Sequence, residues 1–93
     1  MEIELGEGFT GDEVAVLVDG REVWRRAGVR TNWSVGIADV VRVADPASLV
    51  AVHTRDTAAT FRLASADQPV RLRADLDRTG RLHLGPASDQ PAY

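Results

Sequence analysis

Apolar and polar side chains alternate with a period of two along almost the whole chain, and this pattern is typical of β-strands. The clearest alternation covers residues 70–77, where Val70, Leu72, Ala74 and Leu76 lie on one face and Arg71, Arg73, Asp75 and Asp77 on the other. No segment carries the longer period of a long helix. The pattern therefore predicts an all-β protein.

The strongest local signal is a hairpin centred on Asp19-Gly20, because both central positions of its two-residue turn require positive φ. In the strand before it, residues 13–18, the side chains on both faces are apolar, which predicts that both faces are buried. A regular two-residue hairpin pairs Val16 with Val23 and Ala15 with Trp24. In that register the valines face the core, and Trp24 lies with Leu17 on the reverse face.

The remaining segments predict further strands. We expect strands at 40–43 and 49–54, joined by a turn at 45–48, and a strand at 57–63 with Ala59, Phe61 and Leu63 inward. Arg78-Thr79-Gly80 turns the chain after 70–77, and Leu82 and Leu84 point inward on the returning strand. Residues 27–32 are expected to cross between sheets, whereas 33–38 fit either a strand or a single helical turn.

Length and composition allow one domain. The 93 residues are 44% hydrophobic and include no cysteine, so the fold has one core and no disulfide or zinc ribbon. Seven or eight short strands predict a small antiparallel β-sandwich, immunoglobulin-like or transthyretin-like, or a small barrel. We expect the domain to span 1–84 and residues 85–93 to form an extended C-terminal tail.

The charge pattern argues against several partners. The net charge is −3, the pI is about 5.2 and every cation is an arginine, so a basic field for nucleic acid or an anionic membrane is missing. The acidic, alternating start differs from a secretory signal, which predicts a cytoplasmic protein. Arg25-Arg26, Arg71 and Arg73 form either a local basic patch or, more simply, solvated strand faces.

Motifs for catalysis and for cofactors are weak. Residues 6–11 spell G-x-G-x-x-G, but a strand is expected after them where a phosphate loop requires a helix. His53 and His83 are thirty positions apart, so no metal-ligand pair exists in the sequence. Asp75 and His83 are expected to face each other as a surface ion pair. The sequence therefore predicts a non-enzymatic protein without cofactor or metal.

Aromatic residues carry the two functional hypotheses. The first is a protein-interaction module, an adaptor or a self-associating sandwich, because an uncovered Trp24 and Leu17 would make an exposed apolar patch. Its predicted partner-binding residues are Leu17, Glu22, Trp24, Arg25, Pro91 and Tyr93. The competing interpretation places Trp24 in the core.

The second hypothesis is a module that binds a small molecule or a carbohydrate. Trp33 lies in a loop-like stretch beside polar residues, so its ring is a platform for a sugar, an anchor for a partner, or a plug that closes one end of the sandwich. The predicted ligand-binding residues are Asn32, Trp33 and Asp39.

Overall fold

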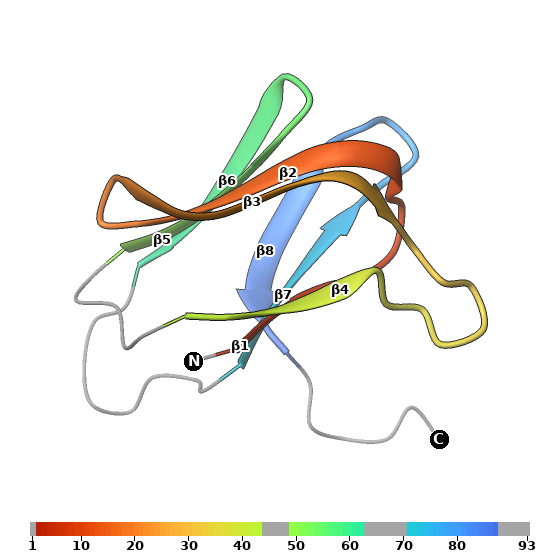
Figure 1. Ribbon diagram of the computed structural model, residues 1–93, viewed down its shortest axis with the longest axis horizontal. Helices are drawn as coiled ribbons and strands as arrows, with labels where there is room; N and C mark the ends of the chain where they lie inside the picture. The colour runs from red at the N-terminus through yellow and green to blue at the C-terminus, as the bar shows by residue number, and fades with distance from the viewer. Residues whose placement is uncertain (1, 44–48, 63–70, 88–93) are drawn as a thin grey trace.

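A computed structural model describes residues 2–43, 49–62 and 71–87, and these residues form an all-β sandwich of two four-stranded sheets (Figure 1). The predictions for Leu63, Val70, Pro91, Tyr93 and the turn at 45–48 concern residues outside the described ranges. The strands are β1 (Glu2–Leu5), β2 (Thr10–Val18), β3 (Arg21–Arg30), β4 (Asp39–Arg42), β5 (Leu49–Thr54), β6 (Thr57–Arg62), β7 (Arg71–Leu76) and β8 (Leu82–Pro86).

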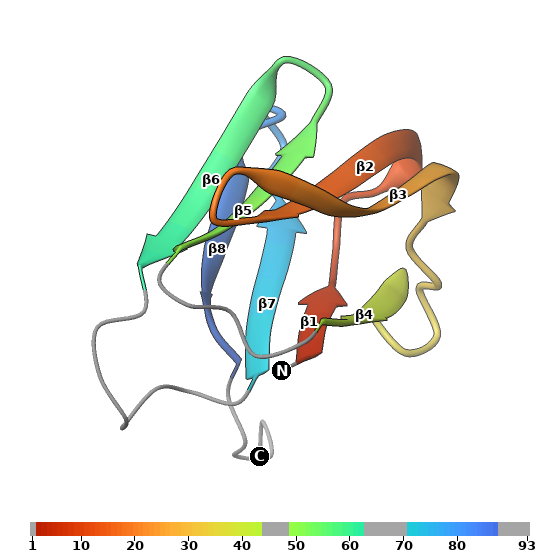
Figure 2. The same ribbon diagram turned by 60° about the vertical axis from the view of Figure 1, so that its left-hand side comes forward.

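The strand order is β4-β1-β7-β8 in one sheet and β3-β2-β5-β6 in the other. Figure 2 shows the β2–β3 ribbon of the second sheet lying across β1 and β7 of the first. All pairs are antiparallel except one, because β1 runs parallel to β7. The predicted small β-sandwich of eight strands is confirmed, with β1–β7 as one parallel pair among the antiparallel ones. The cause is the loop 6–9, which carries the chain from β1 into the opposite sheet instead of a hairpin.

The core lies between the sheets and is built from alternate side chains of each strand, those that point toward the opposite sheet. The alternation predicted these inward faces for β6, β7 and β8, and the structure confirms them for the described residues. Ala59, Phe61 and Leu84 pack against the core from partly buried positions. The largest fully buried side chains in the described residues are Phe9, Ile3, Leu5, Leu72, Val14, Val16, Val41, Val50 and Val52.

The β2–β3 hairpin forms at Asp19-Gly20, both with positive φ, but its register differs from the predicted one. Val18 pairs with Arg21 and Leu17 with Glu22, whereas Val16 pairs with Trp24 because a β-bulge at Val23 inserts one extra residue. A bulge of this kind moves every later side chain to the opposite face. Trp24 therefore packs against the core, and Val23 is 47% exposed.

Two segment boundaries differ from expectation, and one alternative is settled. Strand β3 continues through Arg30, so the crossing to the other sheet begins later than residue 27. Of the two alternatives for residues 33–38 the structure shows the single turn, because the Gly36 amide donates to the Asn32 carbonyl four residues earlier, and an isolated bridge between Asn32 and Ile37 closes the loop. Strand β8 extends to Pro86, two residues into the predicted tail, and the Ala87 amide donates to the Arg71 carbonyl.

Candidate functional site

The face predicted to bind a partner is the outer face of the β2–β3 ribbon. The bulge turns Trp24 away from this face and toward the core. Leu17 is half-buried beside its pairing partner Glu22. Arg25 donates from Nε and Nη2 to Glu22 Oε1 at 2.9 and 2.5 Å and from Nη1 to Glu13 Oε1 at 2.5 Å. The hydrogen bond to Glu22 is the main reason why the pKa of Arg25 is raised. This face presents paired charges rather than an apolar patch.

The new register changes the expected behaviour of Trp24. A tryptophan on an exposed face tolerates replacement, but Trp24 contacts the core. We expect Trp24→Ser to lower the free energy of unfolding by about 2 kcal/mol, measured by urea denaturation. The control is Trp33→Ser, which should cost no more than about 0.5 kcal/mol because Trp33 is 70% exposed. Equal urea midpoints for the two variants would show that Trp24 adds nothing to the core.

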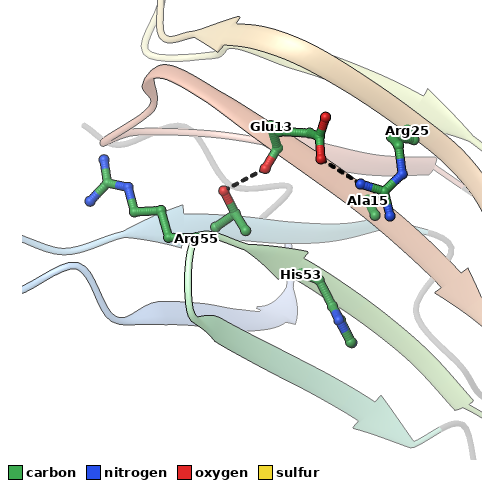
Figure 3. Close-up of a pocket in the computed structure, with 6 residues that line it drawn as sticks. Glu13, Ala15, Arg25, His53 and Arg55 are labelled. Atoms are coloured by element: carbon green, nitrogen blue, oxygen red, sulfur yellow. Dashed lines mark hydrogen bonds and ion pairs between the residues drawn. The ribbon is translucent and has the colours of Figure 1, made fainter.

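A hollow of about 400 Å³ lies on the same outer face, and Figure 3 shows the residues that line it. Glu13 and Arg25 reach toward each other, while His53 and Arg55 extend away from this pair. Arg55 is itself bound to Asp12, from Nε to Oδ1 at 2.7 Å, which lowers the pKa of that carboxyl. Because both guanidinium groups are occupied, the hollow offers little unpaired charge to a ligand.

The predicted cluster of arginines is divided between the two sheets. Arg26 on β3 donates to Asp39 Oδ2 at 2.7 Å. On β7, Arg71 and Arg73 both pair with Glu4, which is only 7% exposed, and Arg73 also contacts Asp75 Oδ1 at 3.2 Å. The arginines therefore do not form one basic patch. Arg25, Arg71 and Arg73 neutralise carboxylates on their own or an adjacent strand, and Arg26 pairs with a carboxylate of the other sheet.

Trp33 has the most exposed of the large apolar side chains in the described part of the chain, at 70%, with Val35 next to it in the loop at 66%. The interpretation of Trp33 as a plug is therefore wrong. Its ring borders a hollow of about 540 Å³, which we call the Trp33 hollow. This volume lies within the usual range for small-ligand sites. The lining residues are Glu7, Gly8, Trp33, Leu76, Asp77 and Arg78.

The loop that carries Trp33 is held by hydrogen bonds at several points. The Val35 and Gly36 amides donate to the Asn32 carbonyl at 3.1 and 2.7 Å, and Gly36 adopts the positive φ that closes this turn. Arg73 Nη2 donates to the Gly36 carbonyl at 3.0 Å, which ties the loop to β7. A loop whose backbone is held before binding loses less conformational freedom on contact with a ligand.

The structure does not bring the other predicted ligand-binding residues to this hollow. Asn32 Oδ1 accepts from the Ser34 amide at 3.0 Å, so its side chain shapes the loop. Asp39 is occupied by Arg26 and by the Val40 amide. The true neighbours of Trp33 come from the β1–β2 loop and the β7–β8 turn. Their only sequence signal was the G-x-G-x-x-G segment, which leads into strand β2 and is therefore no phosphate loop.

Asp77 organises the β7–β8 turn at the rim of the Trp33 hollow. Its Oδ1 accepts from the Thr79 hydroxyl at 2.6 Å, the Thr79 amide at 2.9 Å and the Arg81 amide at 3.0 Å. His83 Nε2 lies 2.8 Å from Oδ2. Asp75 does pair with His83 in the β-ladder, as expected, but the histidine contacts Asp77 instead. An Asp75–His83 ion pair was therefore a wrong prediction.

These contacts make the turn sensitive to acid. The Thr79 hydroxyl, His83 and the Arg81 amide hold the pKa of Asp77 well below its usual range. A depressed pKa adds stability above the ordinary aspartate value, near pH 4, and this stability is lost as the pH falls below it. We expect the difference in Tm between wild type and Asp77→Asn to be constant near neutral pH and to shrink below about pH 4. Asp56→Asn, an exposed site in the β5–β6 turn, controls for net charge. A difference that is unchanged down to about pH 2 would contradict this role.

Comparison of the chain with protein-family models, with curated proteins and with solved structures finds no match. Within residues 2–43, 49–62 and 71–87, the structure contains no helix of the length and apolar character needed to cross a bilayer. The same residues contain no group of three or more histidine or acidic side chains placed to hold a metal ion.

Proposed function

We propose that this protein is a non-catalytic module that binds a small ligand in the Trp33 hollow. The observation that carries the proposal is the exposure of Trp33 on a hydrogen-bonded loop, at the border of a hollow of ligand size. Exposing a tryptophan forgoes the burial that stabilises a fold, and exposed aromatic side chains commonly mark interaction sites. A location in the cytoplasm remains a prediction from the sequence alone.

The test compares wild type with Trp33→Ala against a chemically diverse panel of small molecules by saturation-transfer NMR. We expect a subset of compounds to contact the wild-type protein and to lose that contact in Trp33→Ala, whose Tm should be nearly unchanged. If every compound that contacts wild type contacts Trp33→Ala equally, or if none contacts wild type, the proposal fails.

A second candidate is the protein-interaction module, now centred on the Trp33 loop instead of the Trp24 face. The observation in its favour is Val35, which is 66% exposed beside Trp33 but does not line the hollow. Two exposed apolar side chains at one loop tip suit the contact centre of a protein interface. Light scattering over a range of concentrations gives the mass in solution of wild type and of Val35→Ser. It tests whether the protein associates with itself through this loop. A dimer that Val35→Ser dissociates supports the interaction module.

A further inference from the structure

The polar groups around the Trp33 hollow differ in what they have left to offer a ligand. Asp77 accepts four hydrogen bonds, from Thr79 twice, from Arg81 and from His83. A carboxylate has about four lone-pair sites, two on each oxygen, and in Asp77 Oδ1 takes three of these hydrogen bonds and Oδ2 takes one. Asp77 is therefore engaged mainly with its own turn and shapes the rim of the hollow.

Glu7 and Arg78 are the groups that remain available. Both side chains line the hollow and both residues are exposed. Within the described residues, neither the Glu7 carboxylate nor the Arg78 guanidinium has a hydrogen-bond or ion-pair partner. This distinguishes Arg78 from the arginines that are paired with carboxylates, which are Arg25, Arg26, Arg42, Arg55, Arg71 and Arg73.

The backbone places Glu7 firmly at this position. Its amide donates to Asp75 Oδ1 at 2.8 Å, and its carbonyl accepts from the Leu76 amide at 2.9 Å. Glu7 Oε1 also lies within 3.8 Å of the position a Cβ would take on Gly36, so the carboxylate is close to the Trp33 loop. One acceptor and one multiple donor therefore lie beside one exposed aromatic ring.

Resting on the proposed function, we propose that the ligand is a neutral carbohydrate that stacks one face of a pyranose ring on Trp33. A pyranose has an apolar C–H face, and its hydroxyls both donate and accept hydrogen bonds. The indole matches the first property, and Glu7 as acceptor with Arg78 as donor matches the second. The two groups that remain available, Glu7 and Arg78, carry opposite charges that offset each other, so the hollow does not favour an acidic or a cationic sugar over a neutral one.

The experiment is a titration of the full chain with methyl glucoside, methyl galactoside, methyl mannoside, maltose, cellobiose and lactose. Backbone amide and indole N–H signals in a nitrogen–proton correlation spectrum report binding, so the Kd can be followed in every variant, and Trp33→Ala identifies the Trp33 indole signal. We expect at least one neutral sugar to shift that signal, with Kd weakened about tenfold or more by Trp33→Ala. Glu7→Gln and Arg78→Met should each weaken it by about threefold or more. Added salt should change the Kd by less than about twofold, because the ligand is uncharged.

Val40→Ser is the matched control, because Val40 is 42% exposed on β4 and does not line the hollow. If no neutral sugar shifts Trp33 while other panel compounds bind through it, this inference fails and the proposed function stands. If no compound at all depends on Trp33, both fail. Tighter binding of glucuronate or glucosamine than of glucose also overturns the assignment to a neutral sugar.

Discussion

Gly8→Ala is expected to destabilise the protein by about 3 kcal/mol or more, or to prevent folding. Gly8 has a φ of +94°, which an alanine adopts only with strain. A Cβ there would also lie 2.1 Å from the Leu76 carbonyl oxygen. That oxygen belongs to the backbone at the end of β7, and the Leu76 amide is bonded to the Glu7 carbonyl. Relief of the clash would therefore disturb the contact between the β1–β2 loop and β7.

Gly20→Ala separates strain from steric clash. Gly20 has a similar φ of +83° in the β2–β3 turn, but a Cβ there would meet nothing within 4 Å. We expect this variant to lose only about 1 kcal/mol, from backbone strain alone. Urea denaturation of both variants at one temperature gives the comparison. Equal losses would show that the close approach of Gly8 to β7 contributes nothing to stability.

The alternation of side chains predicted which face of a strand is buried wherever the strand is regular. It succeeded at β7 because Leu72, Ala74 and Leu76 keep a strict period of two. It failed at β3 because the bulge at Val23 shifts the register, and neither Val23 nor its neighbours have a residue type that demands a bulge. A register that depends on one inserted residue cannot be read from periodicity.

The residues that line the Trp33 hollow could not be predicted from the sequence, for a different reason. Trp33 itself stood out because aromatic residues are scarce in this chain. Its neighbours Glu7 and Arg78 are distant in sequence, and they meet only because β1 runs parallel to β7. That pairing places the loop after β1 and the turn after β7 at the same end of the sheet. Alternation assigns faces to strands but does not say which strands are adjacent.

Thr31 holds the two loops of the site together. It is 4% exposed and lies between the end of β3 and the Trp33 loop. Its hydroxyl accepts from the Phe9 amide at 3.0 Å and donates to the Gly6 carbonyl at 2.7 Å. Its amide donates to the Phe9 carbonyl at 2.8 Å. One side chain therefore satisfies two backbone groups of the β1–β2 loop, in a region that excludes water.

Thr31→Val keeps the shape of the side chain but leaves the Phe9 amide and the Gly6 carbonyl without that partner. We expect a loss of about 3 kcal/mol in the free energy of unfolding, since each buried, unsatisfied polar group costs about 1–3 kcal/mol. Thr54→Val is the matched control. Thr54 is 2% exposed, and its hydroxyl makes one hydrogen bond, to the Glu13 carbonyl at 2.9 Å. Its loss should be about half as large.

The two threonine variants also separate global stability from the geometry of the site. Thr54 lies beside the hollow lined by His53, not the Trp33 hollow. Amide hydrogen exchange at Val35 and Gly36 should accelerate in Thr31→Val by more than the fall in global stability explains, and in Thr54→Val it should follow global stability alone. Equal acceleration in both variants, after correction for stability, would show that Thr31 does not position the Trp33 loop. A loop that loosens only in Thr31→Val would identify one buried hydroxyl as the link between the backbone at Gly6 and Phe9 and the loop that carries Trp33.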